Sequence, residues 1–362
     1  MNNYNLKIED IDYNKLLNRN PIIVDNIKTQ EYLKNKKILI SGGCGSIGSE
    51  IVKQLLNLEI NKLIIIDNSE CGTFELKNEI NEKYKNNQVK LYLADILDLH
   101  RLNNIFDNEK PEIVYHCAAY KHVPIMEENP WESIKVNIIG TKNIADISIK
   151  YKVEKFLMIS TDKAVNPTNV MGASKRVSEI YINNLNRQSN TQFITTRFGN
   201  VLGSSGSVIP TFIKQINKYK KIDITHKDII RYFMTIPEAA QLVLYASTIG
   251  KKEQILMFDM GEPVKIYDLA QNIIKNYTNN DIEINIIGLR AGEKLYEELL
   301  CNGENTLETD NPYIKISKHN EEINYDIFQN NYNELIENYK SLNPTEIKNR
   351  LKKLVPEYKI SY

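Results

Sequence analysis

The sequence predicts an α/β protein built on a doubly wound parallel β-sheet, followed by a smaller C-terminal α/β lobe. Over the first 200 residues, short apolar runs alternate with amphipathic helical stretches. The apolar runs lack the strict in–out alternation of half-exposed strands, which is typical of parallel strands that helices cover on both faces. A glycine-rich string also separates the first strand from the helix that follows it. Together these patterns favour a nucleotide-binding type of sheet.

The length and charge of the chain exclude several classes of function. With 362 residues, it can form one large or two smaller domains. The 46 Lys and Arg residues equal the 46 Asp and Glu residues, so no basic surface for nucleic acid is expected. Apolar runs stay well below the roughly 18–20 residues of a membrane helix, and the polar N-terminus lacks a signal-peptide core. We expect a cytoplasmic protein with neither a membrane segment nor a nucleic-acid partner.

The cysteines indicate a reducing compartment and no metal centre. Cys44, Cys71, Cys117 and Cys301 are far apart and form no CxxC pair. The five histidines are equally scattered. Neither a disulfide framework nor a zinc site is expected from such spacing.

The expected elements follow one another in a regular order. A polar N-terminal extension covers residues 1–36, and the nucleotide-binding domain covers residues 37–203. Strands are expected at 36–41, 61–67, 88–95, 111–119, 153–160 and 191–200. Helices are expected at 49–58, 74–84, 99–106, 133–151 and 173–187. Because a helix separates each strand from the next, the strands can run parallel through crossover connections.

The regular alternation of strands and helices ends after the Gly/Ser loop at 203–207. Shorter strands and loops follow, and residues 204–316 are interpreted as the substrate lobe. Residues 317–362 are expected to form a helical tail. Pro344 stands near the first turn of its last helix, whose apolar residues Ile347, Leu351 and Leu354 share one face.

The glycine-rich string predicts a dinucleotide site. Glycines without Cβ atoms let the backbone turn sharply and approach a pyrophosphate at a helix N-terminus. Asp67 closes the second strand 19 residues beyond Gly48, where a carboxylate can bind both ribose hydroxyls. No Arg or Lys follows directly to hold a 2′-phosphate, which favours NAD over NADP. The predicted cofactor residues are Gly42, Gly45, Ser46, Ile47, Gly48, Asp67, Asp95, Ile96, Ala118, Ala119 and Lys175.

The string Thr161-Asp162-Lys163 is the candidate for chemistry. It places a hydroxyl, an acid and an amine consecutively at the end of the fifth strand. Ligands of such sheets bind in the crevice outside the carboxyl ends of the strands. Adjacent opposite charges often form only a surface pair, but this position beside the cofactor favours an acid–base pair.

Several strings together resemble the bacterial UDP-N-acetylglucosamine 4,6-dehydratases, within the extended short-chain dehydrogenase/reductase superfamily, which has a Rossmann fold. The resemblance covers roughly residues 16–316. The strings are STDKAVNPTNVMGASKR (160–176), AAYKHVPIMEENP (118–130), RFGNVLGSSGSVIP (197–210), RYFMTIPEA (231–239) and RAGEKLYEELL (290–300). Many relatives carry an N-terminal membrane region, so this chain is expected to be a stand-alone form.

The resemblance implies a reaction in which NAD oxidises sugar C4 and later reduces C6. The resulting 4-ketone acidifies the C5 proton. Lys163 would remove this proton if burial lowers the pKa of its amine, and Asp162 would protonate the C6 hydroxyl if its own pKa is raised. Water then leaves, and C5 is reprotonated.

The superfamily's catalytic Tyr is replaced here by Met171, while Lys175 stays in register four residues later. The group that deprotonates the C4 hydroxyl is therefore open among Thr161, a water near Lys175, and Asp162. The Met form resembles the subgroup that retains the C5 configuration, which gives a xylo product. His122 or a water could still serve the other face.

Other roles follow from the resemblance alone. Lys121 and Glu127 should face the hexose, and Asn137 matches the superfamily's active-site Asn. Asn200, Arg231, Arg290 and Glu293 should hold the UDP portion, because pyrophosphate binds guanidinium groups and ribose binds carboxylates. The alternatives are an inverting dehydratase (5-epimerase), a nucleotide-sugar 4-epimerase and a non-catalytic NAD-sensing module. The helices at 133–151 and 173–187 suggest a homodimer or larger homo-oligomer.

Overall fold

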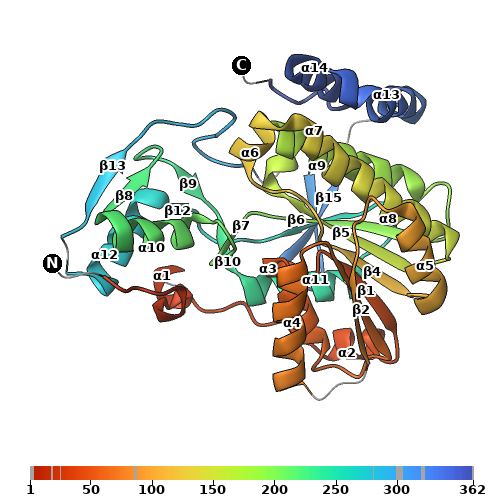
Figure 1. The fold of residues 1–362 in the computed structure, drawn as a ribbon, viewed down its shortest axis with the longest axis horizontal. Helices are drawn as coiled ribbons and strands as arrows, with labels where there is room; N and C mark the ends of the chain where they lie inside the picture. The colour runs from red at the N-terminus through yellow and green to blue at the C-terminus, as the bar shows by residue number, and fades with distance from the viewer. Residues whose placement is uncertain are drawn as a thin grey trace.

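A nine-stranded sheet forms the centre of the molecule (Figure 1). The computed structural model describes residues 4–17, 19–24, 26–84, 88–279, 281–298, 305–318 and 323–360. The strand order is β14-β15-β11-β6-β5-β4-β1-β2-β3. The strands are β1 (Lys37–Ser41), β2 (Lys62–Asp67), β3 (Val89–Leu93), β4 (Ile113–His116), β5 (Lys155–Thr161), β6 (Gln192–Phe198), β11 (Ile255–Phe258), β14 (Asn305–Glu308) and β15 (Ile314–Lys318). The six strands expected from the apolar runs are all present.

Seven strands are parallel and the two at the far edge are antiparallel. Ile38 of β1 lies in register with Leu63 of β2 and with Ile113 of β4, and these central strands are buried on both faces. β15 runs antiparallel to β11 and to β14. The doubly wound α/β class is confirmed, with this antiparallel edge added.

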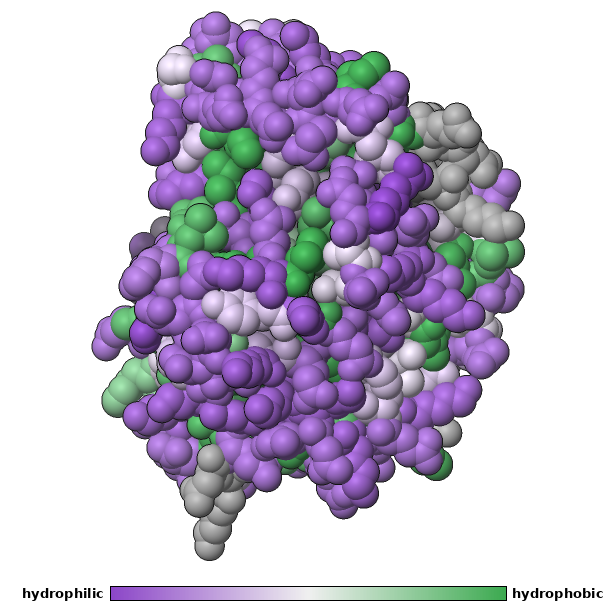
Figure 2. All heavy atoms as spheres, turned by 90° about the vertical axis from the view of Figure 1, so that its right-hand side faces the viewer, coloured by the Kyte–Doolittle hydropathy of each residue, from purple (hydrophilic) through white to green (hydrophobic). Residues whose placement is uncertain are grey.

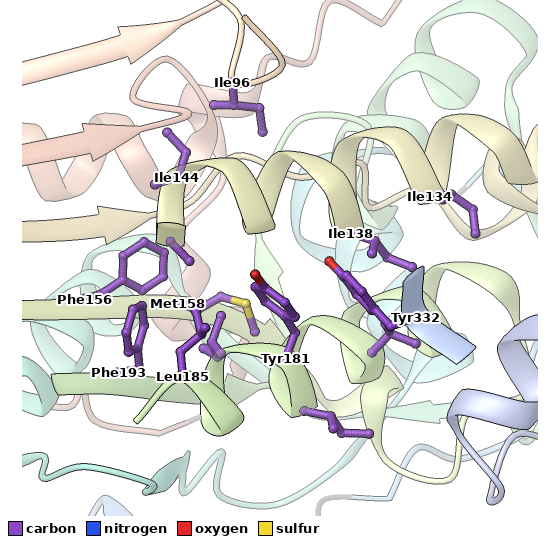
Figure 3. Packing of buried hydrophobic residues seen from close by; sticks show 14 of the residues in the cluster. Ile96, Ile134, Ile138, Ile144, Phe156, Met158, Tyr181, Leu185, Phe193 and Tyr332 are labelled. Carbon is purple, nitrogen blue, oxygen red and sulfur yellow. The ribbon is translucent and has the colours of Figure 1, made fainter. Parts of the chain in front are cut away.

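Helices cover both faces of the sheet. One face carries α5 (Leu99–Glu109), the π-helical turn η2 (Ile134–Gly140), α8 (Thr141–Lys150) and α9 (Val170–Leu185), and Figure 3 shows part of this core. The other face carries α2 (Ile27–Leu33), α3 (Ser46–Leu55), α4 (Glu70–Lys83) and α11 (Ile236–Ile249). Short helices α6 (Val123–Glu128) and α7 (Pro130–Ser133) follow β4 along the chain.

A separate apolar core holds the small lobe together. The lobe consists of α10 (Val208–Tyr219), β8 (Lys221–Ile224), β9 (Ile230–Arg231), β12 (Val264–Lys265), α12 (Ile266–Tyr277) and β13 (Glu283–Ile286). Two further short strands, β7 (Asn200–Leu202) and β10 (Phe233–Thr235), pair with each other. In Figure 1 the small lobe lies beside the large sheet.

The chain crosses between the two parts more often than the expected divisions at 203 and 316 allow. α11 and β11 return to the large sheet, and β14 and β15 join it again. α11 is apolar on most of its surface, with Leu242, Val243 and Ala246 fully buried. Such a helix needs a large apolar partner, and the sheet face supplies one.

The N-terminal segment binds both parts instead of extending from them. Its short helices η1 (Ile8–Asp10) and α1 (Tyr13–Leu17) pack on the small lobe, and α2 packs on the sheet side. Between them, the Arg19 guanidinium donates to both carboxylate oxygens of Glu238 at 2.7 and 2.9 Å.

The C-terminal tail is helical, as expected, and covers α9. It comprises α13 (Tyr325–Asn338), the turn η4 (Tyr339–Ser341) and α14 (Pro344–Leu354), with Asn343 capping α14. Tyr332 stacks on Tyr181 of α9 with ring centroids 4.8 Å apart, and Figure 3 shows the two rings side by side. The homo-oligomer expected from the helices at 133–151 and 173–187 stays a prediction; within this chain, α9 is almost entirely buried, in part by the tail.

The opposite side of the molecule from the small lobe is mostly hydrophilic, with separate apolar spots (Figure 2). Within the described ranges, every helix is too short or too polar to cross a bilayer.

Candidate active site

Three cavities of about 700, 270 and 290 Å³ lie along the carboxyl ends of the parallel strands. The largest shares Gly42, Gly45 and Cys117 with the second cavity, and it shares Lys163 and Asn200 with the third. They therefore form one continuous groove. The second cavity ends beside β2 and β3, and the third ends in the small lobe.

The turn between β1 and α3 fits a pyrophosphate. Gly42 has a φ of +71°, and a Cβ there would lie 2.6 Å from the Ala118 backbone. Gly45, in contrast, has open space on its Cβ side except for the Gly42 carbonyl at 3.4 Å. No side chain caps α3, so its first amides can bind an anion. Ser46, Ile47 and Gly48 line the largest cavity at this turn.

The second cavity has the residues that an adenosine needs. Asp67, Asp95, Ile96, Ala118 and Ala119 all line it, as the sequence predicts. The Asp67 carboxylate accepts hydrogen bonds from the amides of Cys44 and Ser69, both at 2.9 Å, so its position is fixed at the end of β2. Asn68 and Ser69 follow it in the wall of the cavity, and the residues described as lining this cavity include no Arg or Lys. The described residues fit a dinucleotide without a 2′-phosphate.

Thr161 and Lys163 line the largest cavity, and Lys163 also lines the third, whereas Asp162, a predicted catalytic residue, is buried and lines none of the three cavities. Asp162 is 1% exposed, and its Oδ1 accepts from Thr161 Oγ1 and from Lys163 Nζ, each at 2.9 Å. Lys163 Nζ also donates to Asn200 Oδ1 at 3.2 Å. Asp162 Oδ2 is buried without a hydrogen-bond partner among the described residues. An unsatisfied buried oxygen beside a cavity is suited to binding a ligand hydroxyl.

The pKa of Lys163 is raised, whereas the expected role of Lys163 as a base required a lowered pKa. Burial alone would lower it, but the carboxylates of Asp162 and Glu297 raise it above its ordinary value. In the ligand-free chain Lys163 is therefore an ammonium group. It becomes a base only by giving up its proton.

Met171 and Lys175 lie together in the wall of the largest cavity. Both are in the first turns of α9 and are buried, at 3% and 4% exposure. Burial lowers the pKa of Lys175 to about 8, against the opposing effect of Glu179. Its Nζ has no hydrogen-bond or ion-pair acceptor in the part of the chain that the structure describes. A buried amine without a partner is poised to bind a ligand or move a proton.

The third cavity brings together the residues expected to hold UDP. Asn200, Arg231, Arg290 and Glu293 all line it, together with Lys121, which was expected to face the hexose. Arg231 is held by three backbone carbonyls, those of Ile230, Lys294 and Leu295, at 2.7 to 3.2 Å.

Sequence reasoning missed Glu297, which is 7% exposed and lies 3.8 Å from Arg231. The sequence could have indicated Glu297, because this residue belongs to the string of the resemblance that starts at Arg290. His122 was expected only as an alternative proton donor, and it lines both the first and third cavities. Burial and the neighbouring Lys121 lower the pKa of His122.

Two predicted substrate residues are not in the groove. Glu127 instead accepts from the Val170 amide at 2.5 Å and pairs with Lys348 of α14 at 2.8 Å. Asn137 is fully buried and exchanges hydrogen bonds with the Tyr120 backbone, at 2.8 and 3.0 Å. Asn137 therefore positions the groove wall at Tyr120 and does not line the groove itself.

The described cysteines are free, and Cys301 lies outside the described residues. Within the described ranges, no cluster of three or more His, Cys, Asp or Glu side chains is placed to bind a metal ion.

The sheet and the glycine turn define an extended short-chain dehydrogenase-type fold, and the groove at the strand ends fits a dinucleotide. Residues 38–319 match the polysaccharide biosynthesis protein family, and the chain belongs to this family. It is 45% identical over 315 residues to the probable polysaccharide biosynthesis protein EpsC of Bacillus subtilis, covering 86% of this chain and 53% of that protein. The chain thus spans about half the length of the curated relatives that it matches first.

Relatives of similar length carry two different activities in their names. The chain is 37% identical to the UDP-N-acetylglucosamine 4,6-dehydratase (inverting) of Campylobacter jejuni, covering 77% of this chain and 82% of the relative. It is 35% identical to a UDP-glucose 4-epimerase of Rickettsia bellii, covering 80% and 85%. Among solved structures, Pen from Bacillus thuringiensis superposes with a TM-score of 0.74 at 34% identity, covering 82% and 90%. These matches establish the family, and the names of these two relatives are those of enzymes that act on UDP-sugars.

Proposed function

We propose that this chain is an NAD-dependent UDP-N-acetylglucosamine 4,6-dehydratase that retains the C5 configuration. The observation that carries the proposal is the buried Asp162–Lys163 pair, whose lysine lines the cavities between the glycine turn and Arg231. A 4-epimerase moves protons only at the C4 oxygen. An acid and a base side by side are what an elimination across C5 and C6 requires.

The cofactor is bound along the glycine turn and the second cavity. Asp67 binds the adenosine ribose, the N-terminus of α3 binds the pyrophosphate, and Lys175 binds the nicotinamide ribose. Bound NAD supplies the hydride acceptor for C4 and returns the hydride to C6. The UDP portion is held by Arg231, Arg290 and Glu293 in the third cavity.

The proton steps at C5 and C6 need only one proton to move within the pair. Lys163 Nζ and Asp162 Oδ1 are 2.9 Å apart. Transfer of the ammonium proton to the carboxylate produces a neutral amine and a carboxylic acid. The amine of Lys163 then removes the C5 proton, and Asp162 protonates the C6 oxygen, which leaves as water. Lys163 returns its proton to C5 after C6 is reduced.

Lys175 is the group that takes the C4 hydroxyl proton. Thr161 is less suited because its hydroxyl already donates to Asp162. Asp162 is needed for the C6 oxygen. A pKa of about 8 gives Lys175 a useful fraction of neutral amine near neutral pH, directly beside Met171 in the cavity wall. This proton replaces the one that Asp162 gives to the C6 oxygen, so that one water is released in each turnover.

Incubation with UDP-N-acetylglucosamine and no added reductant tests the proposal. Mass spectrometry should find the loss of one water from the sugar nucleotide, with no consumption of free cofactor. A product of unchanged mass but inverted at C4, detected by NMR, would make the chain a 4-epimerase. An unchanged substrate beside retained dinucleotide would favour the non-catalytic module.

A further inference from the structure

The first turn of α9 is a junction of four parts of the molecule. Gly172 in this turn packs so closely on the strand-end loop that a Cβ there would lie 2.1 Å from the Lys163 carbonyl oxygen. Asn169 caps the helix by accepting from the Gly172 amide at 2.8 Å. The Asn169 amide donates to the Gly292 carbonyl at 3.2 Å, which joins the Arg290–Glu293 loop to the same turn. The placement of this turn therefore sets the positions of Lys163, Met171 and the UDP loop together.

The C-terminal tail provides the other anchors of the junction. Glu127 accepts from the Val170 amide with Oε1, while its Oε2 pairs with Lys348 Nζ of α14. Both side chains are largely buried, at 8% and 15% exposure. The Lys359 amide donates to the Pro167 carbonyl at 2.8 Å, just before the turn. One turn further along α9, Arg176 Nε donates to Glu357 at 2.8 Å.

We propose that Lys348 is a positioning residue for the active site, acting through Glu127 on the first turn of α9. The bridge holds the Glu127 carboxylate against the Val170 amide, one residue before Met171. Without Lys348, the carboxylate is left without this cation in a largely buried place, and it turns toward water. The Val170 amide then loses its acceptor, and the turn that supports Lys163 and Lys175 loosens. The tail therefore helps to position the active site and does not only cover α9.

The chain offers a matched control two residues away. Arg350 also lies on α14 and pairs with Glu334, which belongs to α13 of the same tail. Lys348→Met and Arg350→Met each remove one cation and one ion pair from this helix. Only the first removes an ion pair that links the tail, through Glu127, to the first turn of α9.

Hydrogen exchange and kinetics together test the proposal. In Lys348→Met, amide exchange measured by mass spectrometry should speed up at least tenfold in peptides covering residues 166–172. In the dehydration assay, kcat should fall about tenfold, because small displacements of reacting groups cost rate steeply, while KM changes less than threefold. Arg350→Met should leave both near wild type, and Lys348→Arg should restore both. The exchange measurement uses no substrate. It therefore tests the Lys348–Glu127 ion pair even if the chain does not catalyse the proposed dehydration. In that case, the amount of retained dinucleotide replaces kcat and should fall at least threefold.

An unchanged kcat in a folded Lys348→Met protein would overturn the proposal, even if exchange rose. Equal kcat losses in Lys348→Met and Arg350→Met would also overturn it, because they would indicate general destabilisation. If Lys348→Met does not fold, Glu127→Gln takes its place, since the amide oxygen can still accept from Val170. It should then raise exchange less than tenfold and lower kcat, and a wild-type kcat would contradict the bridge's role.

Discussion

Asp162 and Lys163 are adjacent in sequence and complementary in chemistry. The Asp162 side chain is fully buried and the Lys163 side chain is 17% exposed, so the amine reaches the groove while the acid lies beneath it. We predict that Asp162→Asn and Lys163→Met each lower kcat by about 10²–10⁴, the usual contribution of one proton-transfer group. Steady-state assays by mass spectrometry measure this. Lys83→Met, which breaks a surface pair with Glu79, serves as a control and should stay within about twofold.

A retained wild-type rate in either site variant would remove the acid–base mechanism while leaving the fold unaffected. Loss of bound dinucleotide in the same variants would point to a cofactor effect instead. Dinucleotide content is therefore measured beside kcat.

The depressed pKa of Lys175 predicts the pH dependence of the first step. The active form is the neutral amine, so the rate of C4 oxidation should rise with pH through about 8 and level off above it. Stopped-flow absorbance of the reduced nicotinamide measures this step alone. In Lys175→Arg the charge remains but a neutral form does not occur, so the rate should fall and the rise near pH 8 should vanish. A profile that persists in Lys175→Arg would assign the step to another group.

Met171 leaves Lys163 as the main titrating group at C5. One base that removes and returns a proton from one face gives retention, so we predict the xylo product. Reaction in D₂O followed by NMR of C5 decides this. An arabino product would exclude the single-base mechanism and direct attention to His122, which lines the same cavity. Met171→Tyr is the matching probe: inversion by this change alone would make position 171 the determinant.

At the scale of the elements, the turn between β1 and α3 contains two glycines with different roles. Gly42 is required by the fold, and Gly45 is expected to be required for NAD binding. Gly42→Ala places a Cβ against Ala118 in a left-handed backbone, which strains the fold. Gly45→Ala meets only the Gly42 carbonyl oxygen at 3.4 Å, on the side where the pyrophosphate would lie. We predict that Gly45→Ala changes the free energy of unfolding by less than about 0.5 kcal/mol but weakens NAD binding about tenfold or more. Thermal melting and cofactor titration measure the two effects.

Gly42→Ala should instead lower the melting temperature first. If both variants bind NAD like wild type, the groove beside this turn does not hold the pyrophosphate. Dinucleotide released from the wild-type protein by denaturation should be NAD, and recovery of mainly NADP would contradict the role of Asp67.

The elements that the sequence predicts well are those whose pattern depends on local burial. The strands Lys37–Ser41 and Lys62–Asp67 are apolar between their polar end residues because both faces of the sheet are covered. Periodicity does not state which apolar surface an element joins, so α11 and β11 were expected in the small lobe. Side-chain partners are still less visible: Glu127 has a position in a family string, but its partner Lys348 lies 221 residues away in a segment outside that resemblance.

At the scale of the whole molecule, the tail from residue 323 onward packs on α9, one of the two helices from which the sequence predicts an oligomer. Tyr332 is fully buried against Tyr181, and the Trp131 indole donates to the Leu342 carbonyl at 2.9 Å. Removal of this segment would expose a continuous apolar face of α9 and its neighbours. The tail therefore keeps this apolar face out of water.

We predict that a chain ending at residue 322 self-associates or precipitates, whereas the full chain does not associate through α9. Sedimentation velocity measures this directly. Tyr332→Ala is a milder change that weakens the contact between the tail and α9 without removing the tail. That substitution removes a large buried ring and should cost about 3–5 kcal/mol of unfolding free energy, with increased association at high concentration. Ile327→Ala is the matched control, because Ile327 lies on the exposed side of α13 at 59% exposure. A truncated chain that stays monomeric and folded would mean that the tail is dispensable for covering α9. A full chain whose dimer is broken by surface charges on α9 would restore the dimer expected from the sequence.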